Sequence, residues 1–170
     1  MSDGRVYIGG DSAGSNGHTL ITRADAKVFA KGGFIFGFTS SFRMGQLLRY
    51  SFEPPKRHPD TDLMAYMVTQ FIDALRACMK AGGFARTDSS VEAGGTFLVG
   101  HAGRLFAVYD DYQVGEAVAD YEACGCGDQL ARGAMFATAG GEPEARIRAA
   151  LAAAEAHSPG VRGPFHIESI

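Results

Sequence analysis

The sequence contains no tryptophan and only three cysteines, Cys78, Cys124 and Cys126, among its 170 residues. Three is an odd number, and two of the cysteines lie two positions apart, so the pattern is not that of a disulfide framework. No hydrophobic run approaches the roughly 20 residues that a membrane-spanning helix needs. The first residues are polar where a secretory signal would be apolar. We therefore predict a cytoplasmic protein in a reducing compartment, with no membrane partner.

The sequence also lacks an excess of charge of one sign. Sixteen lysines and arginines stand against nineteen aspartates and glutamates, which gives a net charge of -3. Because the two signs are mixed along the chain, there is no basic stripe that would follow a phosphate backbone. Nucleic acid is therefore not an expected partner. A hydrophobic content of 46% over this length is enough for one core, and we predict a single domain over residues 1–170.

The chain does contain many short apolar runs that are separated by glycine. Apolar, β-branched or alternating patterns predict strands at residues 6–8, 18–22, 27–29, 34–38, 96–100, 104–109, 121–127 and 164–170, with turns at 9–10 and 14–17. Helical spacing predicts helices at residues 41–52, 60–81, 129–138 and 142–156. Strand groups thus alternate with helix pairs. This order predicts the α+β class, as a four-layer αββα sandwich with helices on both outer faces.

The first polar residues of interest are Asp11 and Lys27, sixteen positions apart. Each lies at the edge of a short apolar run. Taken alone, Asp11 is typical of a turn, since aspartate at a strand end accepts backbone amides. Lys27 alone is typical of a solvated strand edge, and an ion pair that serves only the structure is a further interpretation.

Other motifs are weaker. Gly125 and Gly127 precede a predicted helix as in a phosphate-binding turn, but the next glycine, Gly133, lies outside the dinucleotide spacing. Cys124 and Cys126 lack the second pair of ligands that a closed zinc site needs. We therefore predict neither a cofactor nor a metal ion.

The run Gly10-Asp11-Ser12 also resembles the serine motif of an esterase. Such an enzyme requires an aspartate placed shortly before a late histidine. The residues before His157 are Ala154, Glu155 and Ala156, which do not supply it. An esterase that uses Ser12 is therefore the lesser alternative.

Several motifs occur together in an order that resembles the proteasome β-subunit superfamily, in particular the bacterial HslV type, within the N-terminal-nucleophile hydrolases. They are Gly10-Asp11 after the first strand, Lys27 before Val28, Gly37-Phe38 before the first helix, residues 123–127 before the third helix, and residues 165–168 near the end. The resemblance extends over nearly the whole chain. It implies a threonine-type peptidase fold that assembles into a ring, cleaves peptides and can work with an ATP-dependent unfoldase.

The resemblance also implies site residues. Lys27 would hold down the pKa of the nucleophile, with Asp11 as its paired carboxylate. A backbone amide near Ser40 or Ser41 would stabilise the oxyanion at a helix start. Cys126 stands where the family commonly has a serine near the reactive amine. We accordingly take Asp11, Lys27, Cys126 and Ser41 as the candidate catalytic residues.

The chain departs from the family pattern at its beginning. Family members start with a catalytic threonine on a full strand before the Gly-Asp strand, and here about six residues fewer precede Asp11, which corresponds to roughly 20 Å of strand. The first strand is thus expected to be truncated. Ser2 would become the N-terminal residue if Met1 were removed. It is a less favoured nucleophile because it would lie near the tight turn into the first strand, away from the position of the catalytic threonine. Two interpretations remain open: a peptidase subunit whose nucleophile is not visible in this sequence, and a non-catalytic ring or scaffold subunit.

Overall fold

The computed structural model describes residues 1, 3–88 and 91–170, and Ser2, the less favoured nucleophile, lies outside the described residues. The strands are β1 (Tyr7–Gly10), β2 (Ala13–Ser15), β3 (Leu20–Thr22), β4 (Val28–Lys31), β5 (Phe34–Phe38), β6 (Arg86–Asp88), β7 (Val91–Ala93), β8 (Phe97–His101), β9 (Arg104–Val108), β10 (Val114–Glu116) and β11 (His166–Ser169). The helices are α1 (Phe42–Tyr50), α2 (Leu63–Tyr66), the π-helical turn η1 (Met67–Phe71), α3 (Ile72–Ala81), α4 (Asp128–Ala137) and α5 (Pro143–His157).

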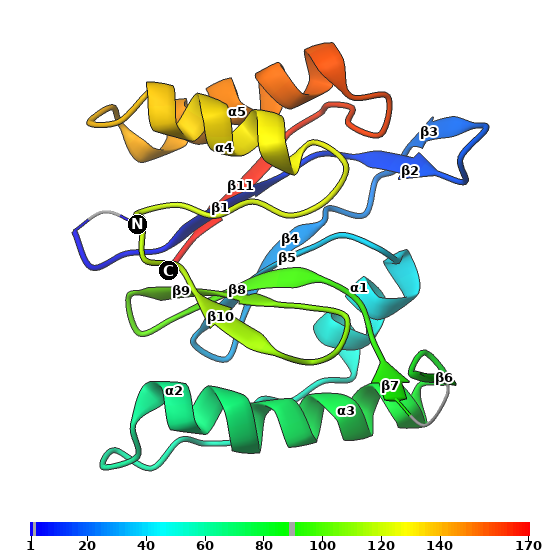
Figure 1. The fold of residues 1–170 in the computed structure, drawn as a ribbon, viewed down its shortest axis with the longest axis vertical. Helices are drawn as coiled ribbons and strands as arrows, with labels where there is room; N and C mark the ends of the chain where they lie inside the picture. The colour runs from blue at the N-terminus through cyan, green and yellow to red at the C-terminus, as the bar shows by residue number, and fades with distance from the viewer. Residues whose placement is uncertain (2, 89–90) are drawn as a thin grey trace.

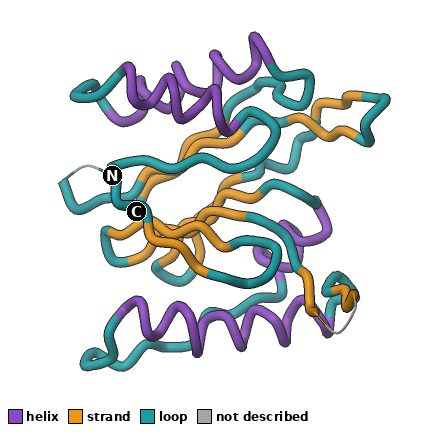
Figure 2. Tube along the Cα trace, in the orientation of Figure 1, coloured by secondary structure: helices purple, strands orange, loops and turns teal. Residues whose placement is uncertain are grey.

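The strands lie between two groups of helices. Antiparallel pairing gives a five-stranded sheet in the order β10-β9-β8-β5-β4, a separate pair of β1 with β11, and a hairpin of β2 with β3. Helices α4 and α5 lie beyond the β1–β11 pair, and α2 and α3 lie on the opposite side of the molecule (Figure 1). Figure 2 shows the same arrangement, with the β2–β3 hairpin projecting from the body. Helices and sheets are thus mixed, as the sequence predicts.

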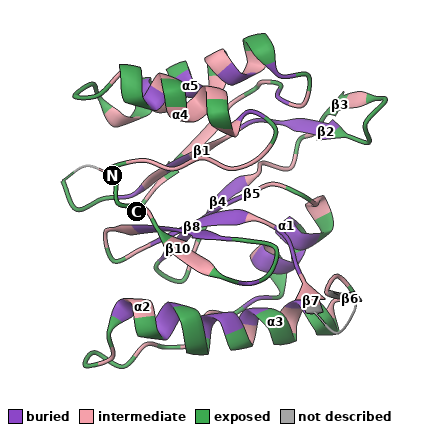
Figure 3. Ribbon diagram, viewed as in Figure 1, coloured by how far each residue is buried: buried purple, intermediate pink, exposed green. Residues whose placement is uncertain are grey.

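Strand β5 explains why some runs are apolar at every position. All five of its residues are buried, because both faces of the strand are covered. Phe36 points into the larger core, with Phe71 and Phe106. The neighbouring Ile35 points to the opposite face, where a smaller cluster includes Ile8 of β1. Side chains alternate between the two faces of a strand, so this strand contributes to two cores at once. Figure 3 shows buried residues on the central strands β4 and β8, between helices that carry many exposed residues.

The predicted helices begin within about three residues of the predicted positions. The Ser41 hydroxyl accepts a hydrogen bond from the Arg43 amide and caps α1, and the Asp62 carboxylate caps α2 by accepting from the Ala65 amide. Both side chains satisfy amides of a first helical turn. The predicted helix over residues 60–81 is found, but a π-helical turn, Met67–Phe71, interrupts it. Sequence periodicity gives no sign of that turn.

Some predicted elements are wrong. Residues 121–127, predicted as a strand that leads into α4, form no strand ladder. A side chain contacts this segment instead: Arg132 Nη2 donates to the Ala123 carbonyl oxygen at 2.8 Å. The strand in this part of the chain is β10, which Gly115 conceals in the apolar pattern. Gly9 and Gly10 continue β1 rather than forming a turn, and Gly14 lies within β2.

Among the residues that the structure describes, no helix is both long and apolar enough to span a bilayer.

Candidate active site

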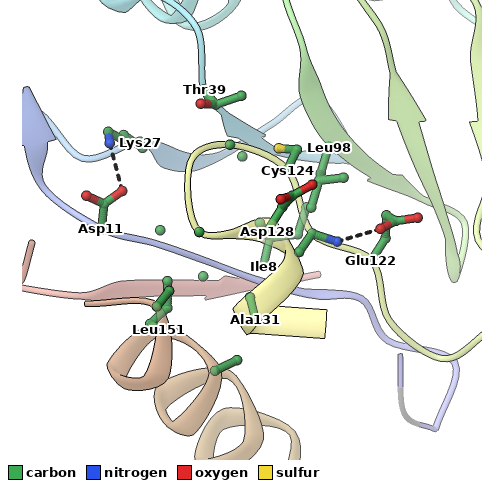
Figure 4. A pocket seen from close by; sticks show the side chains of 18 of the residues that line it. Ile8, Asp11, Lys27, Thr39, Leu98, Glu122, Cys124, Asp128, Ala131 and Leu151 are labelled. Carbon is green, nitrogen blue, oxygen red and sulfur yellow. Dashed lines mark hydrogen bonds and ion pairs between the residues drawn. The ribbon is translucent and has the colours of Figure 1, made fainter. Parts of the chain in front are cut away.

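Asp11 and Lys27 form a buried ion pair. Asp11 directly follows β1 and Lys27 directly precedes β4, so the antiparallel course of the chain brings them together. Lys27 Nζ lies 2.7 Å from Asp11 Oδ1, and the side chains are only 14% and 12% exposed. The second oxygen, Oδ2, accepts hydrogen bonds from the amides of Ala13 at 2.8 Å and Arg162 at 3.1 Å. The carboxylate is therefore fixed on both oxygens, and Figure 4 shows its contact with Lys27.

The lysine side of the pair is bounded by an aromatic ring. Lys27 Nζ lies 5.8 Å from the centroid of the Phe42 ring, at the first residue of α1. On the same ring, the Arg23 guanidinium lies 4.0 Å from the centroid and pairs with Asp25. Among the described residues, no hydroxyl or thiol lies within hydrogen-bond distance of Lys27 Nζ. The cation is therefore positioned, but a nucleophile is not part of the described site.

All four predicted site residues line one cavity of about 760 Å³. These residues come from four different segments, and the fold places all of them on the walls of this cavity: Asp11, Lys27, Ser41 and Cys126. The cavity lies between the five-stranded sheet and helices α4 and α5, beside β1. Figure 4 shows the pair from Asp11 to Lys27 on one side and residues of the segment before α4 on the other. The residues predicted from the sequence thus line the same cavity, and among them only Lys27 and Asp11 have a described contact with each other; their chemical roles stay predictions.

The start of α1 has an unusual backbone. Ser40 has a φ of 64°, a left-handed conformation that a residue other than glycine rarely adopts. The Ser41 amide donates to the Thr39 carbonyl oxygen at 2.7 Å, so it is already engaged, whereas no described residue accepts the Ser40 amide. The Ser40 hydroxyl accepts from the Thr96 amide at 3.1 Å. Strained residues of this kind cluster at functional sites. Of the two serines, Ser40 has the amide that is available to an oxyanion.

The two neighbouring cysteines have different surroundings. Cys126 is exposed, and the Ser158 hydroxyl lies 3.4 Å from its carbonyl oxygen. The whole Cys124 residue is half-buried. Burial of its thiol raises the pKa of that thiol to about 12, and the nearby carboxylates of Asp128 and Glu122 act in the same direction. A thiol with that pKa is neutral and unreactive near pH 7. Within the described residues no group of three or more His, Cys, Asp or Glu side chains is arranged to hold a metal ion.

Ser12, the residue of the esterase alternative, is fully buried. Its hydroxyl donates a hydrogen bond to the Pro164 carbonyl oxygen at 2.7 Å, across the connection that leads into β11. No described histidine lies within hydrogen-bond distance of it. A serine nucleophile needs a base and access to substrate, so this geometry favours a structural role.

Sequence reasoning missed Arg146 of α5, a charged residue on the wall of this cavity. It is only 9% exposed, and its Nη2 donates to the Met135 carbonyl oxygen at 2.9 Å. Its Nε is buried without a hydrogen-bond partner. An arginine in an alanine-rich helix gives no signal of burial, because this residue type is usually exposed.

No protein-family model matches the chain, and no curated protein matches its sequence. Solved structures do match: the chain has the proteasome-like fold of the N-terminal-nucleophile hydrolases. BPH from Thiobacillus denitrificans, solved in complex with epoxomicin, aligns with a TM-score of 0.81 at 22% identity over 100% of this chain and 94% of its own. Eukaryotic HslV from Trypanosoma brucei aligns with a TM-score of 0.67 at 17% identity over 99% and 95%. Anbu from Yersinia bercovieri aligns with a TM-score of 0.63 at 14% identity over 96% and 76%. At these identities the likeness is one of fold.

Proposed function

We propose that this chain is a single-domain, HslV-like peptidase subunit of the bacterial cytoplasm, in which the Lys27–Asp11 pair serves an N-terminal nucleophile. The proposal includes the four-layer αββα sandwich, with the β1–β11 pair as part of the second sheet. The observation that carries it is the 2.7 Å ion pair, which is buried at the wall of a cavity large enough for a substrate. The likeness to bacterial BPH and Anbu supports the same reading.

The geometry fits one kind of chemistry. A fixed ammonium lowers the pKa of a hydroxyl or amine placed beside it, and so raises the fraction of the reactive form. Asp11 keeps Lys27 in place, while its own second oxygen is held by the amides of Ala13 and Arg162. In the proposed reaction, the hydroxyl oxygen attacks the peptide carbonyl carbon and its proton passes to the leaving amine. Water then hydrolyses the ester and restores the hydroxyl.

Since the described residues hold no nucleophile beside Lys27, the proposal assigns that role to the N-terminal residue of the mature protein. We would express the protein from its natural locus with the upstream DNA and measure its intact mass and N-terminal sequence. The purified protein would then be incubated with epoxomicin, the compound with which BPH was solved. A species that begins with threonine and gains the mass of one epoxomicin supports the peptidase. Absence of both results overturns it.

A non-catalytic subunit of the same fold is the second candidate, and the absence of a described nucleophile near Lys27 favours it. Lys27→Ala separates the two candidates. In a peptidase this change abolishes labelling by epoxomicin, whereas a scaffold shows no labelling before or after it. The matched control is Lys56→Ala, at an exposed position outside the cavity.

We further propose that the chain assembles with copies of itself, as a ring or a helix. A helical assembly is described for Anbu from Pseudomonas aeruginosa. Light scattering coupled to size exclusion measures the assembly, and a monomer at all concentrations would overturn this part. An ATP-dependent unfoldase as partner belongs to the same proposal and is tested by whether ATP and the unfoldase speed the degradation of a folded substrate.

A further inference from the structure

Helix α1 turns one face toward the segment that carries Lys27. Phe42, Gly45 and Arg49 are spaced three and then four residues apart, so they lie on the same side of the helix. A Cβ added at Gly45 would lie 2.1 Å from Cζ of the Phe38 ring, so the missing side chain lets α1 lie directly on the end of β5. Phe42 and Arg49 are about 10 Å apart along the helix axis, at 1.5 Å per residue. Each end of this face contacts Lys27 or its neighbours.

Arg49 holds the backbone on both sides of Lys27. Its Nη2 donates to the Ala26 carbonyl oxygen at 2.7 Å and to the Val28 carbonyl oxygen at 3.1 Å. The carbonyl of Lys27 itself accepts from the Phe38 amide at 3.0 Å, toward β5. Successive residues of a strand direct their backbone groups to opposite sides, so the Ala26 and Val28 carbonyls point away from β5, beyond the edge of the sheet that β4 forms. Arg49 therefore fixes the side of this segment that no ladder bond fixes.

The guanidinium of Arg49 is itself held in place. Its carbon lies 4.6 Å from the centroid of the Phe29 ring and 6.0 Å from that of Tyr50. At the other end of β4, Lys31 Nζ donates to the Arg49 carbonyl oxygen at 3.2 Å. The helix thus holds the strand by a side chain, and the strand holds the helix by another. A lysine at position 49 would lack the planar group that stacks on the ring while it bonds two carbonyls.

These contacts bear on the candidate site. Lys27 Nζ is held by Asp11 at 2.7 Å and lies 5.8 Å from the centroid of the Phe42 ring. Its four-carbon side chain is flexible, so the ammonium stays in one place only if the backbone of Lys27 stays there as well. Ser40, whose amide is available to an oxyanion, directly precedes Ser41 and α1. Helix α1 therefore connects the cation with the amide, and Arg49 is the connection at its far end.

We propose that Arg49 is a positioning residue, which holds the Lys27 ammonium at a fixed place relative to the Ser40 amide. It touches no reacting atom and acts through the backbone on either side of Lys27. Its effect on a reaction rate rests on the proposed peptidase function, whereas its hold on Lys27 does not. Loss of the guanidinium frees two carbonyls and lets the ammonium move while every candidate catalytic group remains present. A displacement of about 1 Å in a catalytic group can cost about 100-fold in rate.

The first test is the exchange of hydrogens with water in the full-length chain, followed by NMR. The chain has four lysines, and Lys27→Ala identifies the ammonium signal of Lys27. In Arg49→Ala, the Lys27 ammonium and the Phe38 amide should each exchange about tenfold faster, because the segment that bonds them is loosened. Guanidinium ion at a few millimolar, far below denaturing concentrations, should restore both rates. The matched control is Arg43→Ala on the same helix, whose exposed guanidinium donates to the Gly82 carbonyl oxygen at 2.9 Å. It should change neither rate.

The second test uses the chain made from its natural locus and its labelling by epoxomicin. Arg49→Ala should label about 100-fold more slowly, guanidinium should restore the rate, and Arg43→Ala should keep the wild-type rate. If Arg49→Ala does not fold, Arg49→Lys, which keeps the charge and loses the planar group, should show the same changes to a smaller extent.

Unchanged exchange at Lys27 and Phe38, no recovery with guanidinium, or an equal effect of Arg43→Ala overturns the proposal. So does a wild-type labelling rate in Arg49→Ala. A wild-type chain that epoxomicin does not label counts against the proposed peptidase alone, because the exchange measurements need no nucleophile and still decide whether Arg49 holds Lys27.

Discussion

Lys27 and Asp11 are joined by a 2.7 Å ion pair in which the carboxylate is also held by two backbone amides, those of Ala13 and Arg162. One side chain therefore connects the ends of β1 and β2 with the segment that follows α5. The pair is a structural junction as well as the centre of the candidate site, and any substitution in it has to be measured for both consequences.

Lys27→Ala should lower the free energy of unfolding by about 3 kcal/mol, because it leaves the buried Asp11 charge with only its amide donors. Urea denaturation measures the change. The control Lys56→Ala, at an exposed position, should stay within about 0.5 kcal/mol of wild type. Adding Asp11→Asn to Lys27→Ala should recover part of the loss, since a neutral amide oxygen still accepts from Ala13. Equal stability of Lys27→Ala and wild type would show that the pair contributes nothing to the fold.

Two helical glycines should respond in opposite ways to alanine. At Gly45 in α1, an added Cβ would lie 2.1 Å from Cζ of the Phe38 ring, so Gly45→Ala should destabilise the protein by about 1 to 3 kcal/mol. At Gly133 in α4, no atom lies within 4 Å of the added Cβ, and Gly133→Ala should stabilise by about 0.5 to 1 kcal/mol. Thermal unfolding of the two variants measures the contrast. Stabilisation by Gly45→Ala would contradict the close packing of α1 on β5, and destabilisation by Gly133→Ala would contradict the open space beside α4.

The Cys124 thiol should react slowly with iodoacetamide at pH 8, while the exposed Cys126 reacts at once, because burial raises the pKa of Cys124 to about 12. Peptide mapping after a short exposure identifies the alkylated residue. Equal labelling of both cysteines in the folded protein would contradict the burial of that thiol.

The same thiol should make stability depend on pH in the alkaline range. Its pKa rises from 9.0 to about 12 on folding, so the folded state retains the proton that the unfolded chain loses. The contribution is therefore fully present below pH 9 and is lost progressively between pH 9 and 12. Urea midpoints measured across this range should fall more steeply for wild type than for Cys124→Ala. Parallel curves would mean that Cys124 titrates alike in both states.

Arg132→Met should loosen the segment that crosses the cavity before α4. Arg132 of α4 contacts that segment at two points, the Glu122 carboxylate at 2.5 Å and the Ala123 carbonyl oxygen at 2.8 Å. An ion pair with Asp128, also in α4, holds the Arg132 side chain in position. Loss of bonds that contribute about 1 kcal/mol should speed amide exchange in residues 117–124 about fivefold, with little change elsewhere. Hydrogen-exchange mass spectrometry measures this effect. Arg148→Met on α5 is the control, and a uniform increase over the whole chain would argue against local anchoring.

The sequence was sufficient for most elements, because these depend on local signals, whereas the pairing of the site residues was predicted from the family resemblance. Short apolar runs predict β4, β5, β8 and β9, an alternating run predicts β11, and the capping Ser41 marks the start of α1. The resemblance to a known family, more than the spacing, brought Asp11 and Lys27 together. Both residues proved to line one cavity with Ser41 and Cys126.

The remainder depends on tertiary contacts that no local pattern encodes. The segment before α4 is extended but is held by Arg132 rather than by a neighbouring strand, so its apolar run predicted a strand that is absent. The buried Arg146 depends on the carbonyl of Met135 eleven positions earlier, which a helical pattern does not reveal. The engagement of the Ser41 amide follows from the unusual backbone of Ser40, and only coordinates show it.

The pairing of β1 with β11 has a consequence for biosynthesis. Ser12 and its partner Pro164, next to these strands, are 152 positions apart in the sequence. The ribosome will therefore have made β1 long before its partner emerges, and Asp11 cannot gain its contact with Arg162 until then. Contacts of such long range slow folding, since the loop must close before the pairing stabilises it. The five-stranded sheet with α1 and α3 can assemble earlier, and the candidate site is expected to be completed last.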